Sequence, residues 1–207
     1  MYLPPAFEIE DRDSLYAIIR ENNFGILTNQ VEGAPFATHL PFMVEGDCLV
    51  AHMARANPQW RAFGDGAPAL CVFQGPHAYI SPSWYDSKDM VPTWNYVAVH
   101  VRGTPRIIDD PAAAYATQQR LVAAQELNLP EPWRLENEDR ARIDGLLRSI
   151  VVFEIPIDQI HGKAKMNQNR TLADRRGAIA GLRETGAAGN AAVAEYMARQ
   201  DAEKDIT

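Results

Sequence analysis

The segment TWNYVAVHVR, residues 93–102, alternates valines with aromatic and basic residues. Successive side chains of a β-strand point to opposite faces, so a strand here would place the valines on one face and four functional side chains on the other. These four are Trp94, Tyr96, His100 and Arg102. Such a row can form the wall of a site for a flat, partly polar ligand. It is also typical of a subunit interface, and a ligand cleft between two subunits would satisfy both interpretations.

The overlapping residues GPHAYISPSWYDSKDMVPTWNY, at 75–96, contain five of the 18 Phe, Trp and Tyr residues and three of the 14 prolines. The prolines exclude a helix interior, and a flexible linker would not carry so many aromatic side chains. We therefore predict that the stretch from Tyr79 to Tyr96 forms a rigid wall of a ligand cleft. Packing of the same rings in the core is the alternative.

A second candidate binding segment is AHMARANPQW, residues 51–60, in which the end of a strand is followed directly by a helix start. Asn57 is a good N-cap and Pro58 a good first helical residue. The free N–H groups of a helix start, together with the guanidinium of Arg55, suit a phosphate group. The alternative is that Asn57 only caps its helix and Arg55 is solvated.

The chain has a net charge of −7, but residues 161–183 carry six basic side chains and one acidic one. This segment is either an anion site or a solvated helix face. It continues into two helical runs, which are the best candidates for a DNA-reading element. Their resemblance to a helix-turn-helix is weak, because the loop between them is longer than usual and rich in Gly and Ala.

Other common chemistries lack their sequence signatures. The five histidines, at positions 39, 52, 77, 100 and 161, show neither HxH nor HExxH spacing, so we expect no metal site. No GxSxG, GxGxxG or GxxxxGK[ST] motif is present, which argues against a nucleophile elbow and against the parallel-sheet nucleotide folds. Cys48 and Cys71 lie in apolar, strand-like runs and are expected to be reduced core thiols.

The elements that must position these residues are strands joined by turns, followed by helices. Strands are predicted at 24–28, 35–44, 48–54, 69–75, 93–108 and 149–157, and helices near 11–22, 57–63, 110–127, 137–147, 173–183 and 190–200. This order predicts a mainly β, α+β fold, namely an antiparallel barrel with peripheral and C-terminal helices. No apolar run is long enough to span a bilayer, and no secretory leader is visible at the start, so we expect a cytoplasmic protein.

Five motifs, HLPF, AHMARANPQW, GPHAYISPSWY, VPTWNYVAVHVRG and NQNRTLADRRG, occur in this order along nearly the whole chain. With them the sequence resembles the FMN-binding negative transcriptional regulators, the PaiB-like family. The resemblance implies a split β-barrel of the flavin-binding type, a homodimer, and FMN in clefts between the subunits. We therefore expect a split-barrel domain at residues 1–160 and a helical extension at residues 161–207.

The resemblance also assigns binding residues. Those that match the family's HxARxNPxW pattern, its aromatic motifs and its KxxQNR pattern are His52, Arg55, Asn57, Trp60, Trp84, Tyr85, Trp94, Asn95, Tyr96, Lys165, Asn169 and Arg170. His100 joins them through the strand periodicity described above. At position 167 the family pattern has Ser, whereas this chain has Asn.

Two functions remain open at this point. The family name implies flavin binding and transcriptional repression, and repression would require direct contact with DNA. The alternative is a small FMN-dependent oxidoreductase that uses a nicotinamide or another planar substrate, because the same fold serves both classes of protein.

Overall fold

The computed structural model describes residues 1–187 and 189–204, which form two compact units. Unit 1 is built from residues 1–18, 74–99 and the described residues from 161 onward, and unit 2 from residues 19–73 and 100–160. Both units therefore combine segments that are distant in the sequence. The predicted helical extension ends at residue 207, and residues 188 and 205–207 lie outside the described residues.

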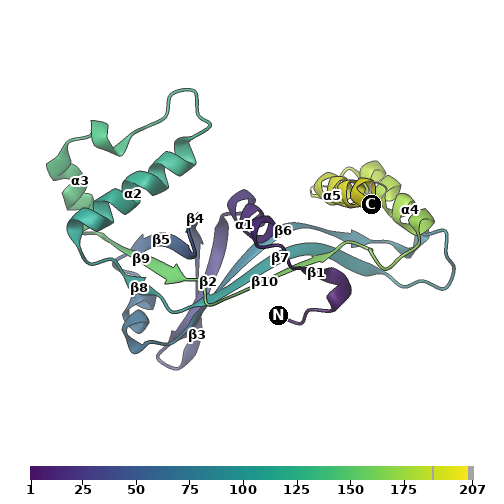
Figure 1. The fold of residues 1–207 in the computed structure, drawn as a ribbon, viewed down its shortest axis with the longest axis horizontal. Coiled ribbons are helices and arrows are strands. Elements are labelled where there is room, and N and C mark those ends of the chain that lie inside the picture. Colours follow the sequence, from purple (N-terminus) through teal and green to yellow (C-terminus); the bar gives the residue numbers. More distant parts are fainter. Residues whose placement is uncertain (188, 205–207) are drawn as a thin grey trace. The chain divides into compact units, whose positions relative to one another are not determined.

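Unit 2 contains a small antiparallel sheet in the order β4-β5-β9-β8 (Figure 1). Outside that sheet, β2 of this unit pairs with β3 and with β6 (Ala69–Ile80). Its elements are β2 (Phe24–Val31), β3 (Ala34–Pro41), β4 (Met43–Glu45), β5 (Cys48–Ala54), the 3-10 helix η2 (Pro58–Asp65), β8 (Arg106–Ile107), α2 (Pro111–Glu126), η4 (Leu135–Asn137), α3 (Arg140–Leu147) and β9 (Ile150–Pro156). Helices α2 and α3 both pack on β9.

Unit 1 contains β1 (Glu8–Ile9), and here the strands follow the order β1-β10-β7-β6. Its other elements are η1 (Pro5–Phe7), η3 (Pro82–Trp84), α4 (Leu172–Thr185) and α5 (Asn190–Lys204). Four elements belong partly to each unit, namely α1 (Arg12–Glu21), β6 (Ala69–Ile80), β7 (Thr93–Gly103) and β10 (Gln159–Lys165). Helices α4 and α5 lie side by side in unit 1 (Figure 1).

The core of unit 2 is aromatic and aliphatic. Phe42 and Phe73 meet edge to face at 5.4 Å between ring centroids, and Phe63 packs on Phe153 at 5.0 Å. Cys71 is fully buried with a free thiol, as predicted, and burial raises the pKa of that thiol. The core therefore rests on apolar packing, for which an unreactive thiol is well suited.

Several predicted elements differ from the structure. The strand predicted at 35–44 is divided into β3 and β4, which lie in different sheets, and the strand predicted at 69–75 continues to Ile80. The strand predicted at 93–108 ends at Gly103, because Pro105 lacks the N–H that would continue the hydrogen-bonded ladder. A short strand, β8, resumes at Arg106. The helix predicted at 57–63 is a 3-10 helix, with Asn57 accepting a hydrogen bond from the N–H of Gln59 at 2.9 Å. The prediction also missed β10, whose pairing with β1 only the folded chain reveals.

Helices α4 and α5 pack on each other through small and aliphatic side chains, and α4 holds the 81–92 loop of unit 1. Gly177 and Gly181, one turn apart on α4, leave room for the main chain and the ring of Trp84. The carboxylate of Asp174, on the same helix, accepts hydrogen bonds from the N–H and the hydroxyl of Ser87, both at 2.8 Å. The aromatic loop is therefore fixed to α4 by packing and by two hydrogen bonds.

Acidification is expected to loosen this attachment. The N–H of Ser87, followed by its hydroxyl and by Thr171, holds the pKa of Asp174 below its ordinary value of 3.8. A lowered folded-state pKa contributes stability that is fully present above the unfolded pKa, about 3.9, and is lost as the pH falls through the folded pKa. Asp174→Asn should therefore flatten the fall in melting temperature below about pH 4. The exposed neighbour variant Asp86→Asn should keep the wild-type slope, and equal slopes for both variants would contradict this assignment.

Among the described residues, no helix combines the length and the apolar character needed to cross a bilayer. In the same part of the chain, no three His, Cys, Asp or Glu side chains gather closely enough to hold a metal ion. The candidate sites for ligands therefore come from aromatic, basic and amide side chains.

Candidate functional site

The structure divides the predicted binding residues between the two units, and each set is described on its own. Unit 1 holds Trp84, Tyr85, Trp94, Asn95, Tyr96, Lys165, Asn169 and Arg170. Unit 2 holds His52, Arg55, Asn57, Trp60 and His100.

Three rings on β6 and β7 form an exposed cluster in unit 1, which we name the aromatic face: His77, Tyr79 and Trp94. Trp94 stacks on His77 with 5.9 Å between ring centroids and meets the edge of Tyr79 at 6.2 Å. Its indole Nε1 donates a hydrogen bond to Nδ1 of His77 at 3.2 Å, which fixes that imidazole nitrogen as an acceptor. Trp94 is 50% exposed and Tyr79 46% exposed, so the rings are preorganised but uncovered.

Strand β6 exposes these rings because its buried face changes along its length. Phe73 and Gly75 are buried, and then Ala78 and Ile80 are buried instead. A strict alternation would have kept the odd-numbered residues inside. The change turns His77 and Tyr79 outward, beside Trp94 of the neighbouring strand. His77 was not among the predicted binding residues. Its position two residues before Tyr79 would place both rings on the same face of a strand, and this spacing was the signal that could have identified it.

Strand β7 alternates as predicted except at Ala98, which is also buried. Val97, Val99 and Val101 are buried, whereas Trp94 and Arg102 are exposed and Tyr96 is half-buried. His100 is also half-buried. The second face of this strand is therefore available for binding at the start of the strand, in the part that belongs to unit 1.

Two lysines of β10 lie next to this face. Nζ of Lys163 is 5.3 Å from the ring centroids of both Tyr96 and Tyr2 and donates to the carbonyl of Tyr2. Nζ of Lys165 donates to the hydroxyl of Thr93 and, at 3.2 Å, to the carbonyl of Trp94.

Burial lowers the pKa of Lys165, and the nearby charges of Lys163 and Arg170 lower it as well, while Tyr96 acts in the opposite direction. A lysine with a lowered pKa gives up its proton more readily, and its charge is less strongly hydrated than that of an exposed lysine. Lys165 therefore provides a donor and positive charge beside flat aromatic surface, whereas Lys163 is buried and bonded to the carbonyl of Tyr2.

Four predicted residues support the loop and the helices of unit 1 instead of facing solvent. Tyr85 is buried, with its hydroxyl accepting from Nδ2 of Asn167 at 3.1 Å and the Arg170 guanidinium 5.8 Å from its ring centroid. Trp84 packs on α4. Asn95 is fully buried on the valine face, where its Nδ2 lies 3.5 Å from Sδ of Met197. Asn169, by contrast, is exposed.

The backbone conformation at position 167 explains why this chain has Asn where the family pattern has Ser. Asn167 has φ 62°, in the left-handed region, which Asn adopts more readily than Ser. Its amide also reaches the Tyr85 hydroxyl, as described above. The asparagine therefore serves both the turn after β10 and the anchoring of the aromatic loop.

The basic segment 161–183 is divided by folding. The side chain of Lys163 is buried, and Arg175 is 3% exposed and paired with Asp201 of α5. Arg176 and Arg183 are exposed. The six cations do not form one continuous anion-binding surface, because two of them are buried in unit 1. Arg175 neutralises Asp201, and Lys163 supports the interior.

In unit 2, Arg55 fastens the junction between α3 and β9. Its Nε donates to the carbonyl of Arg148 at 2.9 Å and its Nη2 to the carbonyl of Ile150 at 2.8 Å. The guanidinium also lies 5.7 Å from the Trp60 ring, whose Nε1 donates to the Arg55 carbonyl at 2.9 Å. A hollow of about 390 Å³ beside it is lined by further charged side chains, Asp109, Arg140, Asp144 and Arg148.

Exchanging this arginine for lysine tests its structural role. Arg55→Lys keeps the charge, but a lysine ammonium cannot donate hydrogen bonds to both carbonyls in the way the planar guanidinium does. The substitution should therefore lower the free energy of unfolding by about 1 to 2 kcal/mol. The matched control is Arg61→Lys, because Arg61 lies over the same Trp60 ring at 5.4 Å. Chemical denaturation measures both, and equal losses would assign the effect to the ring contact.

The remaining predicted residues of unit 2 have distinct environments. Asn57 uses both ends of its amide, accepting from Gln59 and donating to the Thr38 hydroxyl at 2.9 Å, so it acts as a cap. His52 is half-buried on β5, and its Nδ1 is a buried atom without a hydrogen-bond partner among the described residues. Burial lowers the pKa of His52.

Comparison with known proteins identifies the relatives of this chain. The family model described as "Putative FMN-binding domain" matches residues 1–159. "Protease synthase and sporulation protein PAI 2" of Bacillus subtilis is 36% identical over 179 residues, which cover 84% of this chain and 85% of that protein.

Two solved structures share the fold. The FAD and heme binding protein from Mycobacterium smegmatis has a TM-score of 0.62 at 19% identity, over 76% of this chain and 73% of the other. The flavocytochrome Anf3 from Azotobacter vinelandii has a TM-score of 0.58 at 16% identity, over 76% and 69%. The predicted α+β fold, with antiparallel sheets of the flavin-binding split-barrel type, is confirmed.

Proposed function

This chain belongs to the "Putative FMN-binding domain" family, and from that membership we propose that it is a flavoprotein whose aromatic face, in unit 1, contacts the isoalloxazine ring of FMN. The observation that carries the proposal is the exposed stack of Trp94 on His77, with Tyr79 at its edge. Exposed rings held in place before binding offer flat contact surface at low entropic cost.

The residues present fit the chemistry of this cofactor. Isoalloxazine is flat and aromatic and has a polar edge of carbonyl and ring nitrogen atoms. The aromatic face supplies a stacking surface, and Lys165 supplies a donor next to it, since its Nζ bonds the carbonyl of Trp94. Bound FMN would supply hydride or electron transfer, and the protein would supply its orientation and its electrostatic surroundings. The phosphate contact expected for Arg55 stays a prediction.

We further propose that a second copy of the chain covers this face, with FMN held in the cleft between subunits. Trp94, Tyr79 and Val91, which is 67% exposed, leave an apolar area around the start of β7 that suits an interface. The homodimer implied by the family resemblance would bury it.

The test is an absorption spectrum of the purified protein with and without added FMN, recorded together with its mass in solution. A bound-flavin spectrum on a dimer is the expected result. A dimer that ignores FMN would overturn the cofactor site, and a monomer that binds FMN would overturn the shared cleft.

A regulatory role is the second part of the proposal. It is supported by the name of the Bacillus relative, "Protease synthase and sporulation protein PAI 2", which refers to sporulation. Gel-shift assays against the protein's own promoter region, at several salt concentrations, test it directly, because binding to phosphates weakens steeply as salt rises. Nicotinamide oxidation faster than that of free FMN would instead favour the oxidoreductase.

A further inference from the structure

Three cations lie close together in unit 1, on β10 and on the turn that follows it, and we name them the cation cluster: Lys163, Lys165 and Arg170. Lys163 and Lys165 are two residues apart on one strand, so their side chains leave the same face of the sheet. Burial lowers the pKa of Lys165, and the charges of Lys163 and Arg170 lower it further, so both are within its electrostatic reach. Nζ of Lys165 bonds the carbonyl of Trp94 at 3.2 Å, which puts positive charge beside the aromatic face.

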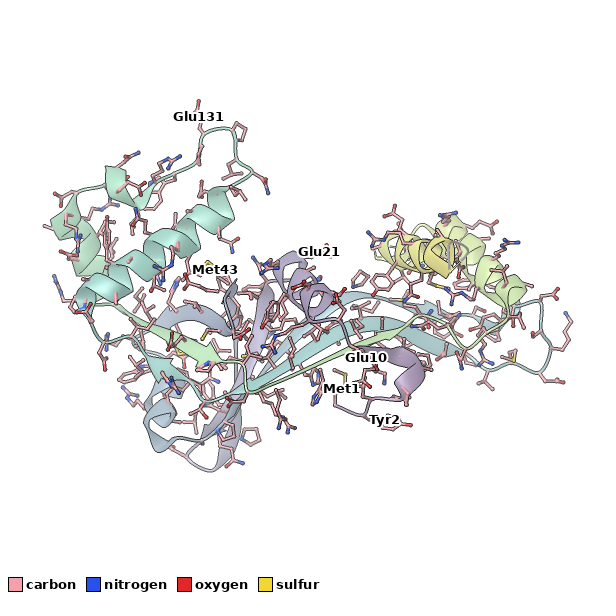
Figure 2. All side chains as sticks on the ribbon, viewed as in Figure 1. Met1, Tyr2, Glu10, Glu21, Met43 and Glu131 are labelled. Carbon is pink, nitrogen blue, oxygen red and sulfur yellow. The ribbon has the colours of Figure 1, made fainter. Side chains whose placement is uncertain are left out.

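Lys163 is the most buried member of the cluster, and its partners are neutral. It is 6% exposed, its Nζ donates to the main-chain carbonyl of Tyr2 at 3.2 Å, and the ring centroids of Tyr2 and Tyr96 are both 5.3 Å away. Tyr2 lies next to Met1 on the N-terminal segment of unit 1 (Figure 2). Glu8 is opposite Lys163 in the β1–β10 ladder, but the ammonium bonds the carbonyl of Tyr2 instead.

The other two members also contact neutral groups. Besides the main-chain carbonyl, Lys165 bonds the hydroxyl of Thr93. The Arg170 guanidinium lies 5.8 Å from the ring centroid of Tyr85, and its Nη1 is 3.8 Å from Sδ of Met90. In the part of the chain that the structure describes, no carboxylate forms an ion pair with any of the three cations. Buried charges are normally paired, so this cluster favours an anion that does not come from its own surroundings.

Reduction gives the proposed cofactor the charge that the cluster lacks. The oxidised isoalloxazine ring is neutral. A hydride from a reduced nicotinamide brings two electrons and one proton to the ring, which gains one negative charge while the nicotinamide is oxidised. The phosphate of FMN is charged in both forms and does not contribute to this difference. Positive charge near the ring therefore favours the reduced form, and Coulomb attraction acts over several ångströms, so the buried Lys163 contributes without touching the ring.

We propose that the cation cluster raises the reduction potential of the bound flavin, so that the protein binds reduced FMN more tightly than oxidised FMN. This inference rests on the proposed function, since it requires the flavin ring to lie on the aromatic face. It extends that function by naming the redox state that the protein favours. The cluster acts through its charge, so a substitution that keeps the charge keeps the effect.

The experiment measures the midpoint potential of FMN bound to the full chain, by anaerobic titration with dithionite against a reference dye. In the wild type this potential should exceed that of free FMN by about 30 mV or more, which corresponds to about tenfold tighter binding of the reduced form for a two-electron couple. Lys165→Met should reduce the preference for reduced FMN by about tenfold, because one unit charge near the ring is lost. Lys165→Arg should keep most of the preference, because it keeps the charge.

The chain offers a matched control in which the same charge is removed. Arg142, on α3 of unit 2, is exposed and has an acidic partner, since its Nη1 lies 2.9 Å from the Glu138 carboxylate. An exposed pair of this kind is screened by salt and solvated. Arg142→Met should therefore leave the midpoint potential of bound FMN at the wild-type value.

Four outcomes would overturn the inference. They are a wild-type potential equal to or below that of free FMN, an unchanged potential in Lys165→Met, equal falls in Lys165→Met and Arg142→Met, and equal falls in Lys165→Met and Lys165→Arg, which would assign the effect to hydrogen bonding. The wild-type measurement decides the question even if a variant fails to fold. Bound flavin with an unshifted potential contradicts the role of the cation cluster alone, whereas no binding of FMN in either redox state contradicts the proposed function together with it.

Discussion

Trp94→Ala is expected to weaken FMN binding by roughly 5- to 150-fold. Stacking of a base on an aromatic side chain contributes about 1 to 3 kcal/mol, and a flavin ring offers at least as much flat surface. Trp94 is the central ring of the aromatic face, because it contacts both His77 and Tyr79. Quenching of FMN fluorescence on titration with the protein measures the change.

The chain offers a matched control for this experiment. Trp133 is also a half-exposed tryptophan, at 44% against 50% for Trp94, but it belongs to unit 2. Trp133→Ala should leave FMN affinity within about twofold of the wild type. If both variants lost FMN equally, or if only Trp133→Ala did, the flavin ring could not be assigned to the aromatic face.

Gly177→Ala is expected to destabilise the protein by about 1 to 3 kcal/mol, although alanine favours helices. A methyl group at this position of α4 would clash with the main-chain carbonyl of Trp84, which can move only if the whole aromatic loop shifts. The cost of such overpacking exceeds the gain in helix propensity of about 0.5 to 1 kcal/mol. Thermal and chemical unfolding measure the loss.

For a second helical glycine we expect the opposite effect on stability. At Gly145 of α3 the same added methyl group would meet only the flexible end of Arg148, at 3.6 Å. Gly145→Ala should therefore stabilise the protein by about 0.5 to 1 kcal/mol, from helix propensity alone. Stabilisation by both substitutions would show that α4 does not hold the loop as tightly as the structure indicates.

The two glycine variants also bear on flavin binding. The 81–92 loop, anchored through Trp84 and through Ser87, directly precedes the strand that carries Trp94. Displacing the loop in Gly177→Ala should weaken FMN binding, whereas Gly145→Ala should not. Preorganised rings lose part of their binding advantage when their support becomes mobile.

Local sequence patterns predicted much of the fold. Alternation along β7 predicted which side chains are buried, and the caps at Asn57 and Asp110 predicted the starts of η2 and α2. These features depend on a few consecutive residues and on main-chain geometry, so they can be inferred without tertiary contacts. Family motifs predicted the flavin-binding class of fold, which the comparisons confirm.

The candidate sites depended more strongly on folding. No local pattern shows that β6 reverses its buried face before His77, since that change reflects what covers each end of the strand. Charge along the sequence could not reveal that Lys163 and Arg175 are buried, because their partners, Tyr2 and Asp201, come from other elements. Long side chains with apolar stems can take either environment, and tertiary packing selects one.

The sequence by itself determined most of the strands and helices, the helix caps, the valine face of β7 and membership of an FMN-binding family. Only the tertiary structure decided that Trp94 stacks on His77, that Trp84 and Asn95 support α4 and α5, and that Lys165 reaches the carbonyl of Trp94. The physical reason is the range of the interactions. Periodicity and capping act within a few residues, whereas a binding site joins side chains that are distant along the chain and meet only when the surrounding core is packed.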